Sequence, residues 1–122
     1  MTMIERYIAG WRAHDLPAIL ETLADDCVVI ESFGPVYRGH QWIKAWVATW
    51  LSEGGQVLEW TIRDIQSFGN IEIAEWTFHY KWRGEEKTFD GATLAKLTGG
   101  RLSYLREYAT TADLYDWQGR FL

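Results

Sequence analysis

Residues 5–34, ERYIAGWRAHDLPAILETLADDCVVIESFG, combine two helical patterns with the start of a sheet. Apolar residues recur at helical spacing from Met3 to Ala13 and predict an amphipathic helix. A shorter second helix is expected to start at Asp15, with Pro17 in its first turn. Residues 24–27 (ADDC) are expected to end this helix and to lead into a strand over residues 28–33. This strand carries Glu31 just before a Phe-Gly-Pro turn.

The rest of the chain predicts one more long helix and a meander of strands. A very short strand follows the turn, and the helix spans His40 to Ser52 with a broad apolar face. Four strands are expected at 57–68, 71–82, 87–98 and 101–111, with a bulge near Asp64. The predicted helices precede the long strands along the chain, and this order indicates a single α+β domain over residues 1–122. We expect a cone-shaped, curved antiparallel sheet, packed against three N-terminal helices and enclosing a pocket.

Composition excludes several classes of function. A net charge of −5 and a pI near 5.1 argue against nucleic-acid and anionic-membrane partners, which need a basic surface. Cys27 is the one cysteine, so no intrachain disulfide is expected. The three histidines fall on different elements, and no phosphate-binding loop occurs, so we predict neither a metal nor a cofactor. Without a leader or an apolar span, a soluble cytoplasmic protein is expected.

The strand patterns raise the question of which side chains face the pocket. On strand 71–82, four aromatic residues share one face, either as pocket wall or as ordinary core. On strand 101–111, Glu107 shares a face with Leu105 and Ala109, and points inward if they do; alternatively it pairs with an external Arg. Glu31 is likewise either a solvent-facing strand end or a pocket carboxylate. Two inward carboxyl groups would have raised pKa values, which suits proton transfer near neutral pH.

The stretch at residues 5–34 also resembles the first half of bacterial ketosteroid isomerases. Together with GGRLSYLREYATT at residues 99–111, it is similar to the wider SnoaL-like group, which includes polyketide cyclases and relatives of limonene epoxide hydrolase. The resemblance implies the nuclear-transport-factor-2-like cone fold. It also implies that Glu31 is a general base and Tyr7 an oxyanion donor. Thr93 stands where the isomerases carry a protonated acid, and can donate only a neutral hydrogen bond.

Glu107 falls where the epoxide hydrolases of this group carry an acid, so it is a candidate second acid or base. Their Arg-x-Asp strand corresponds to residues 75–78, which contain neither residue, so epoxide hydrolysis is not expected. By the same resemblance the predicted pocket walls are Trp11, Trp46, Trp76, Phe78, Tyr80, Leu105 and Ala109.

Three functions remain open at this point. The first is a cofactor-independent enzyme that abstracts a proton next to a carbonyl of a compact, apolar, cyclic substrate, followed by isomerisation or cyclisation. The second is a binding protein that uses the same cavity without catalysis. The third is a scaffold whose pocket is filled by Trp11, Trp46 and Trp76. An open cavity holding both Glu31 and Glu107 would favour the first two.

The resemblance further implies a homodimer formed through the outer face of the sheet. The predicted outward residues of two strands fit such an interface, because they combine mixed charges with aromatic and Arg side chains. These residues are Glu75, Thr77, His79, Lys81, Tyr104, Arg106 and Tyr108. The alternative is an ordinary solvated sheet face.

Overall fold

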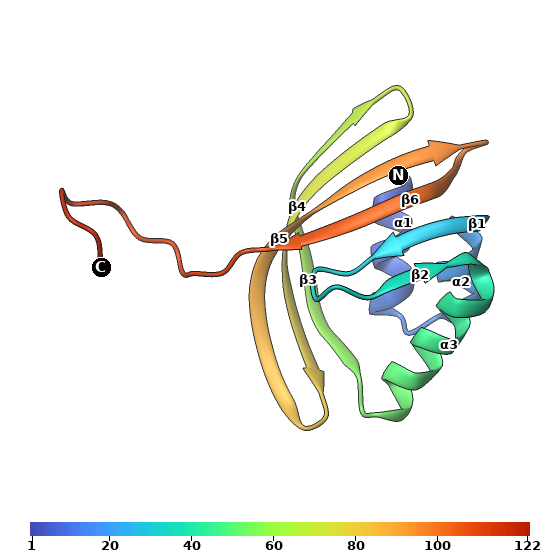
Figure 1. Cartoon of the computed structure of the whole chain (residues 1–122), viewed down its shortest axis with the longest axis horizontal. Coiled ribbons are helices and arrows are strands. Elements are labelled where there is room, and N and C mark those ends of the chain that lie inside the picture. The colour runs from blue at the N-terminus through green and yellow to red at the C-terminus, as the bar shows by residue number, and fades with distance from the viewer.

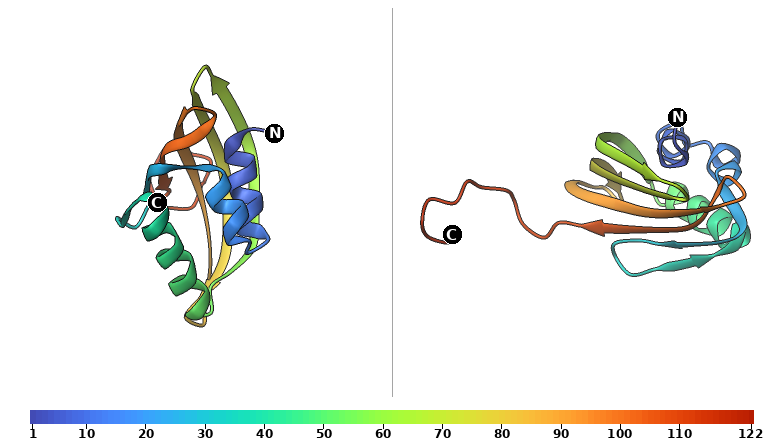
Figure 2. Two further views of the ribbon diagram at one scale, coloured as in Figure 1. Left: turned by 90° about the vertical axis from the view of Figure 1, so that its right-hand side faces the viewer. Right: turned by 90° about the horizontal axis from the view of Figure 1, so that it is seen from above.

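The computed structural model describes all residues from 1 to 122. Three helices lie on one side of a six-stranded, strongly curved sheet (Figures 1 and 2). The elements are α1 (Met3–Arg12), α2 (Leu16–Glu21), β1 (Leu23–Ile30), β2 (Val36–Arg38), α3 (Gly39–Ser52), β3 (Gln56–Phe68), β4 (Ile71–Trp82), β5 (Glu85–Thr98) and β6 (Arg101–Ala109). The α+β fold class predicted from the sequence is confirmed.

Helix α1 is held in place by hydrogen bonds at its first turn. The Thr2 hydroxyl accepts from the amide of Glu5, and the Glu5 carboxylate accepts from the amide of Thr2, which forms a capping box. The buried carboxylate of Glu72 on β4 also accepts from the amides of Met3 and Ile4, at 3.3 and 2.9 Å. A negative charge is favourable at a helix N-terminus, so Glu72 fixes the helix against the sheet.

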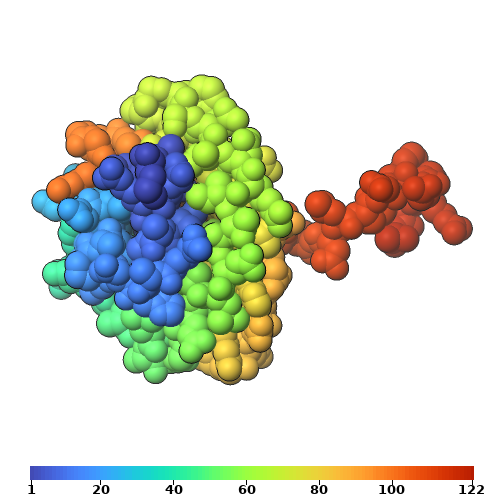
Figure 3. All heavy atoms as spheres, turned by 180° about the vertical axis from the view of Figure 1, so that it is seen from behind, coloured from blue at the N-terminus to red at the C-terminus, as the bar shows by residue number.

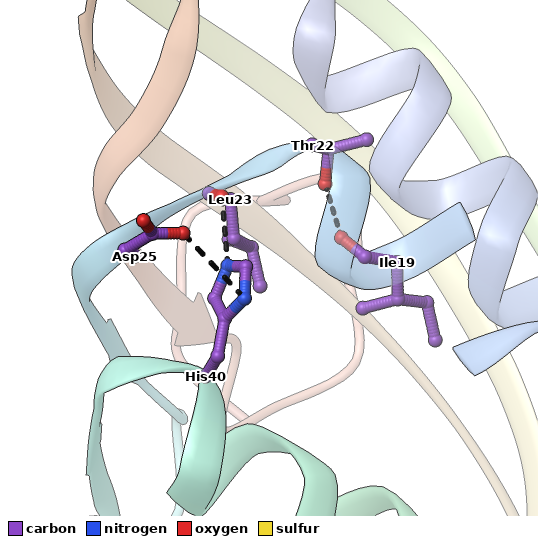
Figure 4. A network of polar contacts seen from close by, with 5 residues as sticks. All are labelled: Ile19, Thr22, Leu23, Asp25 and His40. Atoms are coloured by element: carbon purple, nitrogen blue, oxygen red, sulfur yellow. Dashed lines mark hydrogen bonds and ion pairs between the residues drawn. The ribbon is translucent and has the colours of Figure 1, made fainter. Parts of the chain in front are cut away.

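The start of α3 is tied to the start of β1, as Figure 4 shows. The Nε2–H of His40 donates to the carbonyl of Leu23 at 2.9 Å, and its Nδ1 lies 3.9 Å from Asp25 Oδ1. Next to this contact, the Thr22 hydroxyl donates to the Ile19 carbonyl at 2.7 Å, at the end of α2. The two His40 contacts help to set the position of α3 and hence of the aromatic side chains that it carries.

The strands are arranged in the order β2-β1-β6-β5-β4-β3. Every neighbouring pair is antiparallel except β1 and β6, which run parallel. This parallel pair was not anticipated from the sequence, which suggested an antiparallel sheet throughout. The predicted bulge is present, because the register of β3 against β4 shifts between Ile62 and Asp64. Such a bulge increases the local twist and helps the sheet to curve.

The bounds predicted for the first strand were wrong. A strand was expected at 28–33, but β1 begins at Leu23, directly after α2, and ends at Ile30. The chain joins the sheet early because the amide of Leu102 donates to the carbonyl of Thr22 at 2.8 Å. A register shift between Leu23 and Val28 then accommodates the polar ADDC segment within the strand.

Two glycines leave room for large aromatic side chains next to the cavity. A Cβ atom at Gly91 would lie 2.5 Å from the indole of Trp76 and 2.4 Å from the carbonyl oxygen of Tyr108. A Cβ atom at Gly55 would lie 2.3 Å from the indole of Trp50. Real Cβ atoms do not approach other atoms so closely, so these positions require glycine for Trp50 and Trp76 to pack as they do.

Two further features complete the fold. No helix is both long and apolar enough to span a membrane. Residues 110–122 form no helix or strand, and they extend from the end of β6 on the side of the sheet opposite to the helices (Figures 1 and 2). The space-filling view in Figure 3 shows this segment standing clear of the body.

Candidate functional site

A cavity of about 680 Å³ lies between the helices and the concave face of the sheet. Seven of the eight tryptophans of the chain line it: Trp11, Trp42, Trp46, Trp50, Trp60, Trp76 and Trp82. Its size falls within the usual range for small-molecule sites. Trp11, Trp46 and Trp76 form walls of this open cavity rather than filling it. The scaffold hypothesis expected these three side chains to fill the pocket, so the structure does not favour it.

The aromatic walls are packed against one another, which gives the cavity a defined shape. Trp11 on α1 lies 4.8 Å from Trp46 on α3, measured between ring centroids. On the sheet side, Trp60 lies 4.7 Å from Phe78, and Phe78 stacks on Tyr80 at 5.0 Å. Aromatic pairs at such spacings restrict each other's rotation. The predicted inward face of β4 is therefore the cavity wall.

Glu31 lies just beyond β1, in the turn to β2, and lines the cavity. The turn is closed by hydrogen bonds from the Glu31 amide to the Pro35 carbonyl and from the Gly34 amide to the Glu31 carbonyl, both 3.0 Å long. The Tyr37 hydroxyl donates to Glu31 Oε1 at 2.5 Å, and the Tyr37 ring stacks on Trp46 at 4.1 Å. Burial raises the pKa of Glu31, and the Tyr37 hydrogen bond opposes this shift.

Glu107 lies beside Glu31 because of the parallel pairing of β1 with β6. The register pairs Val29 with Leu105 and Ile30 with Arg106. The next residues after these pairs are Glu31 and Glu107, which therefore lie side by side. Both carboxyl groups line the cavity. Burial raises the pKa of Glu107 to about 8, and the charge of Glu31 adds to the shift. At neutral pH Glu107 therefore keeps its proton.

We call Glu31 and Glu107 the inner pair, and the carboxylates at the cavity mouth differ from them. Glu53 forms an ion pair with Arg83 at 2.8 Å, and Glu85 lies 3.4 Å from Lys87. Glu31 and Glu107 form no ion pair. Because no cation compensates these two groups, burial and the Tyr37 hydrogen bond set the pKa of Glu31, and burial and the charge of Glu31 set the pKa of Glu107.

Tyr7 reaches the cavity from α1, and its hydroxyl is buried without a hydrogen-bond partner. The indole N–H groups of Trp11 and Trp60 are also buried without a partner. The Tyr7 ring lies 6.4 Å from that of Trp11 and 6.5 Å from that of Trp60. Burial, and then the charge of Glu107, raise the pKa of Tyr7, so its hydroxyl stays protonated and available as a donor.

Three predicted site residues do not line the cavity. Thr93 is buried, and its hydroxyl accepts a hydrogen bond from Trp76 Nε1 at 2.8 Å. Trp76 lines the cavity at this point, and Thr93 does not. Leu105 belongs to the hydrophobic core, and Ala109 is the last residue of β6. The expected roles of Thr93 as a donor and of Leu105 and Ala109 as pocket walls therefore lack a geometric basis.

Sequence reasoning missed other residues of the site, and Tyr37 matters most among them. A hairpin across the Phe-Gly-Pro turn pairs Val29 with Tyr37, which places Tyr37 on the same face as Glu31. This pairing is a signal that the sequence does contain. Further cavity residues that were not predicted are Trp42, Trp50, Trp60 and Phe89.

The histidines stay outside the cavity. His14 accepts a hydrogen bond from the amide of Val57 at 3.1 Å, and His79 pairs with Glu86 at 2.6 Å on the exposed face of the sheet. No group of His, Cys, Asp and Glu side chains is arranged to hold a metal ion. Apart from Lys87, which pairs with Glu85 at the mouth, the ionisable groups that line the cavity are carboxyl and phenol groups, which suit proton transfer.

The raised pKa of Glu107 predicts an unusual dependence of stability on pH. In the unfolded chain Glu107 loses its proton near pH 4.5, whereas in the folded chain it does so near pH 8. The unfolded state therefore binds fewer protons between these values. The free energy of unfolding should fall as the pH rises, by up to about 1.4 kcal/mol per pH unit from this group.

Urea unfolding measured across this pH range checks the expectation. Glu107→Gln should flatten the decline, whereas Glu85→Gln at the exposed mouth should leave it unchanged. An identical pH profile for the wild type and Glu107→Gln would contradict a half-buried, protonated Glu107.

Comparison with known proteins identifies the family and the fold. A family model described as the SnoaL-like domain matches residues 4–105. The chain belongs to the SnoaL-like domain family. No curated protein matches the chain well enough in sequence to indicate an activity.

Several solved structures share the fold. One is a protein of ketosteroid isomerase-like fold from Catenulispora acidiphila in complex with trimethylamine, with 19% identity, a TM-score of 0.76, and 88% of this chain and 86% of that chain covered. An epoxide hydrolase from M. tuberculosis has 18% identity and a TM-score of 0.77, with 88% and 80% covered. TerC, co-crystallised with polyporic acid, has 19% identity and a TM-score of 0.74, with 88% of each chain covered. At these identities the likeness is one of fold.

Proposed function

We propose that this SnoaL-like protein is a cofactor-independent enzyme that moves a proton at a carbon next to a carbonyl group. The observation that carries the proposal is the inner pair of carboxyl groups. Glu31 accepts a hydrogen bond that favours its ionised form, whereas Glu107 keeps its proton because of burial and the charge of Glu31. Neighbouring carboxyl groups held in different protonation states can serve as base and acid at the same pH.

The proposed reaction begins with transfer of the substrate's α-proton to the Glu31 carboxylate. The electron pair of the broken C–H bond forms a carbon–carbon double bond, and the carbonyl π electrons move to the oxygen. Tyr7 and protonated Glu107 then donate hydrogen bonds to this oxygen. In a substrate with a β,γ double bond, return of the proton from Glu31 to the γ carbon of the dienolate completes an isomerisation. In a substrate with a second carbonyl group, attack of the enolate carbon forms a new carbon–carbon bond, and Glu31 returns the proton to the resulting alkoxide to complete a cyclisation.

Glu107 replaces a donor that the sequence had suggested at Thr93. These two residues are direct neighbours across β5 and β6. A carboxylic acid is a stronger donor than a hydroxyl group, and donors aimed at a developing oxyanion supply a large part of such catalysis. The proposal therefore assigns Glu31 as base, with Tyr7 and Glu107 as oxyanion donors, and leaves Thr93 as support for Trp76.

The cavity supports a compact, apolar substrate. Its walls are mostly aromatic, and the volume of about 680 Å³ accommodates a fused-ring molecule. The related structures with trimethylamine and polyporic acid hold small molecules of very different chemistry. A second candidate is therefore a binding protein, favoured by the buried, unpartnered donors of Tyr7, Trp11 and Trp60, which a ligand oxygen would satisfy.

Exchange of α-hydrogens for deuterium tests the proposal without knowledge of the natural product. The purified protein is incubated in D₂O with apolar ketones such as β-tetralone, decalone and a steroid 3-ketone, and exchange is followed by NMR. We expect exchange above the buffer rate for at least one fused-ring ketone. A ketone that raises the melting temperature without exchanging would instead support the binding protein, and absence of both effects would favour the scaffold.

A further inference from the structure

The two carboxyl groups of the inner pair are alike in chemistry and share one cavity, yet the proposed reaction gives them opposite roles. Both line the cavity, and neither forms an ion pair. Their hydrogen bonds differ. Glu31 accepts one from the Tyr37 hydroxyl at 2.5 Å, whereas the carboxyl group of Glu107 makes none. Tyr37 is therefore the polar contact that distinguishes the two groups.

Glu31 needs such a contact because it lies in a turn and not within a strand. The hydrogen bonds of its amide and carbonyl fix the backbone at Glu31, but they leave the side chain free to rotate. The bond from Tyr37 ends on Oε1 and is the one hydrogen bond that this side chain makes. Oε2 has no partner, so it is the oxygen that can accept a proton from the substrate.

The Tyr37 hydroxyl is itself held in place by strand pairing and by aromatic packing. Tyr37 is the middle residue of β2 and pairs with Val29 of β1. Its ring lies flat against Trp46 of α3, with 4.1 Å between the centroids and 8° between the planes. Trp46 in turn packs on Trp11 of α1, at 4.8 Å. Burial, and then the bond to Glu31, raise the pKa of Tyr37, so its hydroxyl stays protonated and acts as a donor.

The other titratable groups around the cavity make no such contact with the inner pair. They are Tyr7 of α1, Glu53 at the end of α3, Tyr80 of β4, and Glu85 and Lys87 of β5. Glu53 pairs with Arg83, and Glu85 with Lys87, at the cavity mouth. None of these groups forms a hydrogen bond or an ion pair with Glu31 or Glu107. Tyr37 alone holds one member of the pair and not the other.

This contact decides which of the two groups is ionised. A hydrogen bond from a neutral donor stabilises the charged form of a carboxyl group. Once Glu31 is ionised, its charge opposes the ionisation of Glu107. We infer that Tyr37 is the positioning residue that makes Glu31 the base and Glu107 the acid, and that it presents Oε2 of Glu31 to the substrate. This inference rests on the proposed function and names the residue that separates the two roles.

Tyr37→Phe tests the inference, because it keeps the ring and its stack on Trp46 and removes only the hydroxyl. The pKa of Glu31 should then rise by roughly one to two pH units, the shift that corresponds to a lost hydrogen bond to a charged group. Since Glu31 carries less charge at a given pH, the pKa of Glu107 should fall. A carbon-detected NMR titration should show the two transitions moving toward each other. Tyr104→Phe, on the outer face of the sheet, is the matched control and should move neither.

The α-hydrogen exchange of a reactive ketone reports the same change through the reaction. In Tyr37→Phe the acid limb of the pH–rate profile should move upward with the pKa of Glu31. The rate at the plateau should fall roughly tenfold to a hundredfold, because Oε2 is no longer held in place. KM for the ketone should stay nearly constant, since the variant keeps the cavity walls. A wild type that exchanges no ketone would refute the proposed reaction, whereas the titrations would still decide the role of Tyr37.

Trp46→Leu tests the stack separately, because it leaves the Tyr37 hydroxyl and removes the surface on which the ring lies. It should move the two titrations in the same directions as Tyr37→Phe, by a smaller amount. Wild-type titrations in Trp46→Leu would exclude the stack from the positioning of Glu31. Unchanged titrations of Glu31 and Glu107 in Tyr37→Phe would overturn the proposal and make Tyr37 a packing residue of the hairpin formed by β1 and β2.

Discussion

Glu31→Gln is expected to slow the α-hydrogen exchange of a reactive ketone by roughly 10²- to 10⁴-fold, the range typical of general-base catalysis. The amide keeps the size of the side chain, and its oxygen can still accept from the Tyr37 hydroxyl, so the turn should stay folded. What is lost is the basic carboxylate. NMR measurement of deuterium incorporation under saturating ketone gives the rate for wild type and variant.

The experiment carries a second readout that does not need activity. The charge of Glu31 contributes to the raised pKa of Glu107, so Glu31→Gln should lower the Glu107 pKa. A carbon-detected NMR titration follows this group directly. Glu85→Gln, a change of the same kind at the cavity mouth, should affect neither the rate nor the titration. An unchanged exchange rate in Glu31→Gln, with a shifted Glu107 titration, would show that the two carboxyl groups interact but that the base lies elsewhere.

The sequence was sufficient to predict the helices and the long strands, because their signals are local. The spacing of Tyr7 and Trp11 along a helix, and the alternation along residues 71–82, each follow from a single element. The structure confirms these elements and places the aromatic side of β4 on the cavity wall.

The arrangement of the inner carboxyl pair could not be predicted in the same way. It depends on the parallel pairing of β1 with β6, two segments separated by most of the chain, and local patterns carry no information about such a pairing. The same pairing explains why the direction of Glu107 had remained open from the sequence. Thr93 shows the limit of the resemblance: the isomerases carry a donor at this position, but here the hydroxyl accepts a hydrogen bond from Trp76, and Thr93 does not line the cavity.

The largest effect expected outside the carboxyl pair is that of Tyr7→Phe. Removal of one oxyanion donor typically lowers the rate by roughly 10²- to 10³-fold, and the same loss is expected for ketone exchange here. Stability should not fall with it. The Tyr7 hydroxyl is buried without a partner, and a buried polar group without a hydrogen bond is unfavourable. The free energy of unfolding should therefore stay constant or rise by up to about 1 kcal/mol.

This separation of rate from stability distinguishes a catalytic hydroxyl from a structural one. Urea unfolding and deuterium exchange are measured on the same preparations, with Tyr104→Phe on the outer sheet face as the matched control, expected to change neither. If Tyr7→Phe lowered stability and left exchange unaffected, the hydroxyl would belong to the packing of α1 and not to the site. A loss of rate at constant stability would instead place the substrate oxygen beside Tyr7, within reach of the proton that Glu107 holds.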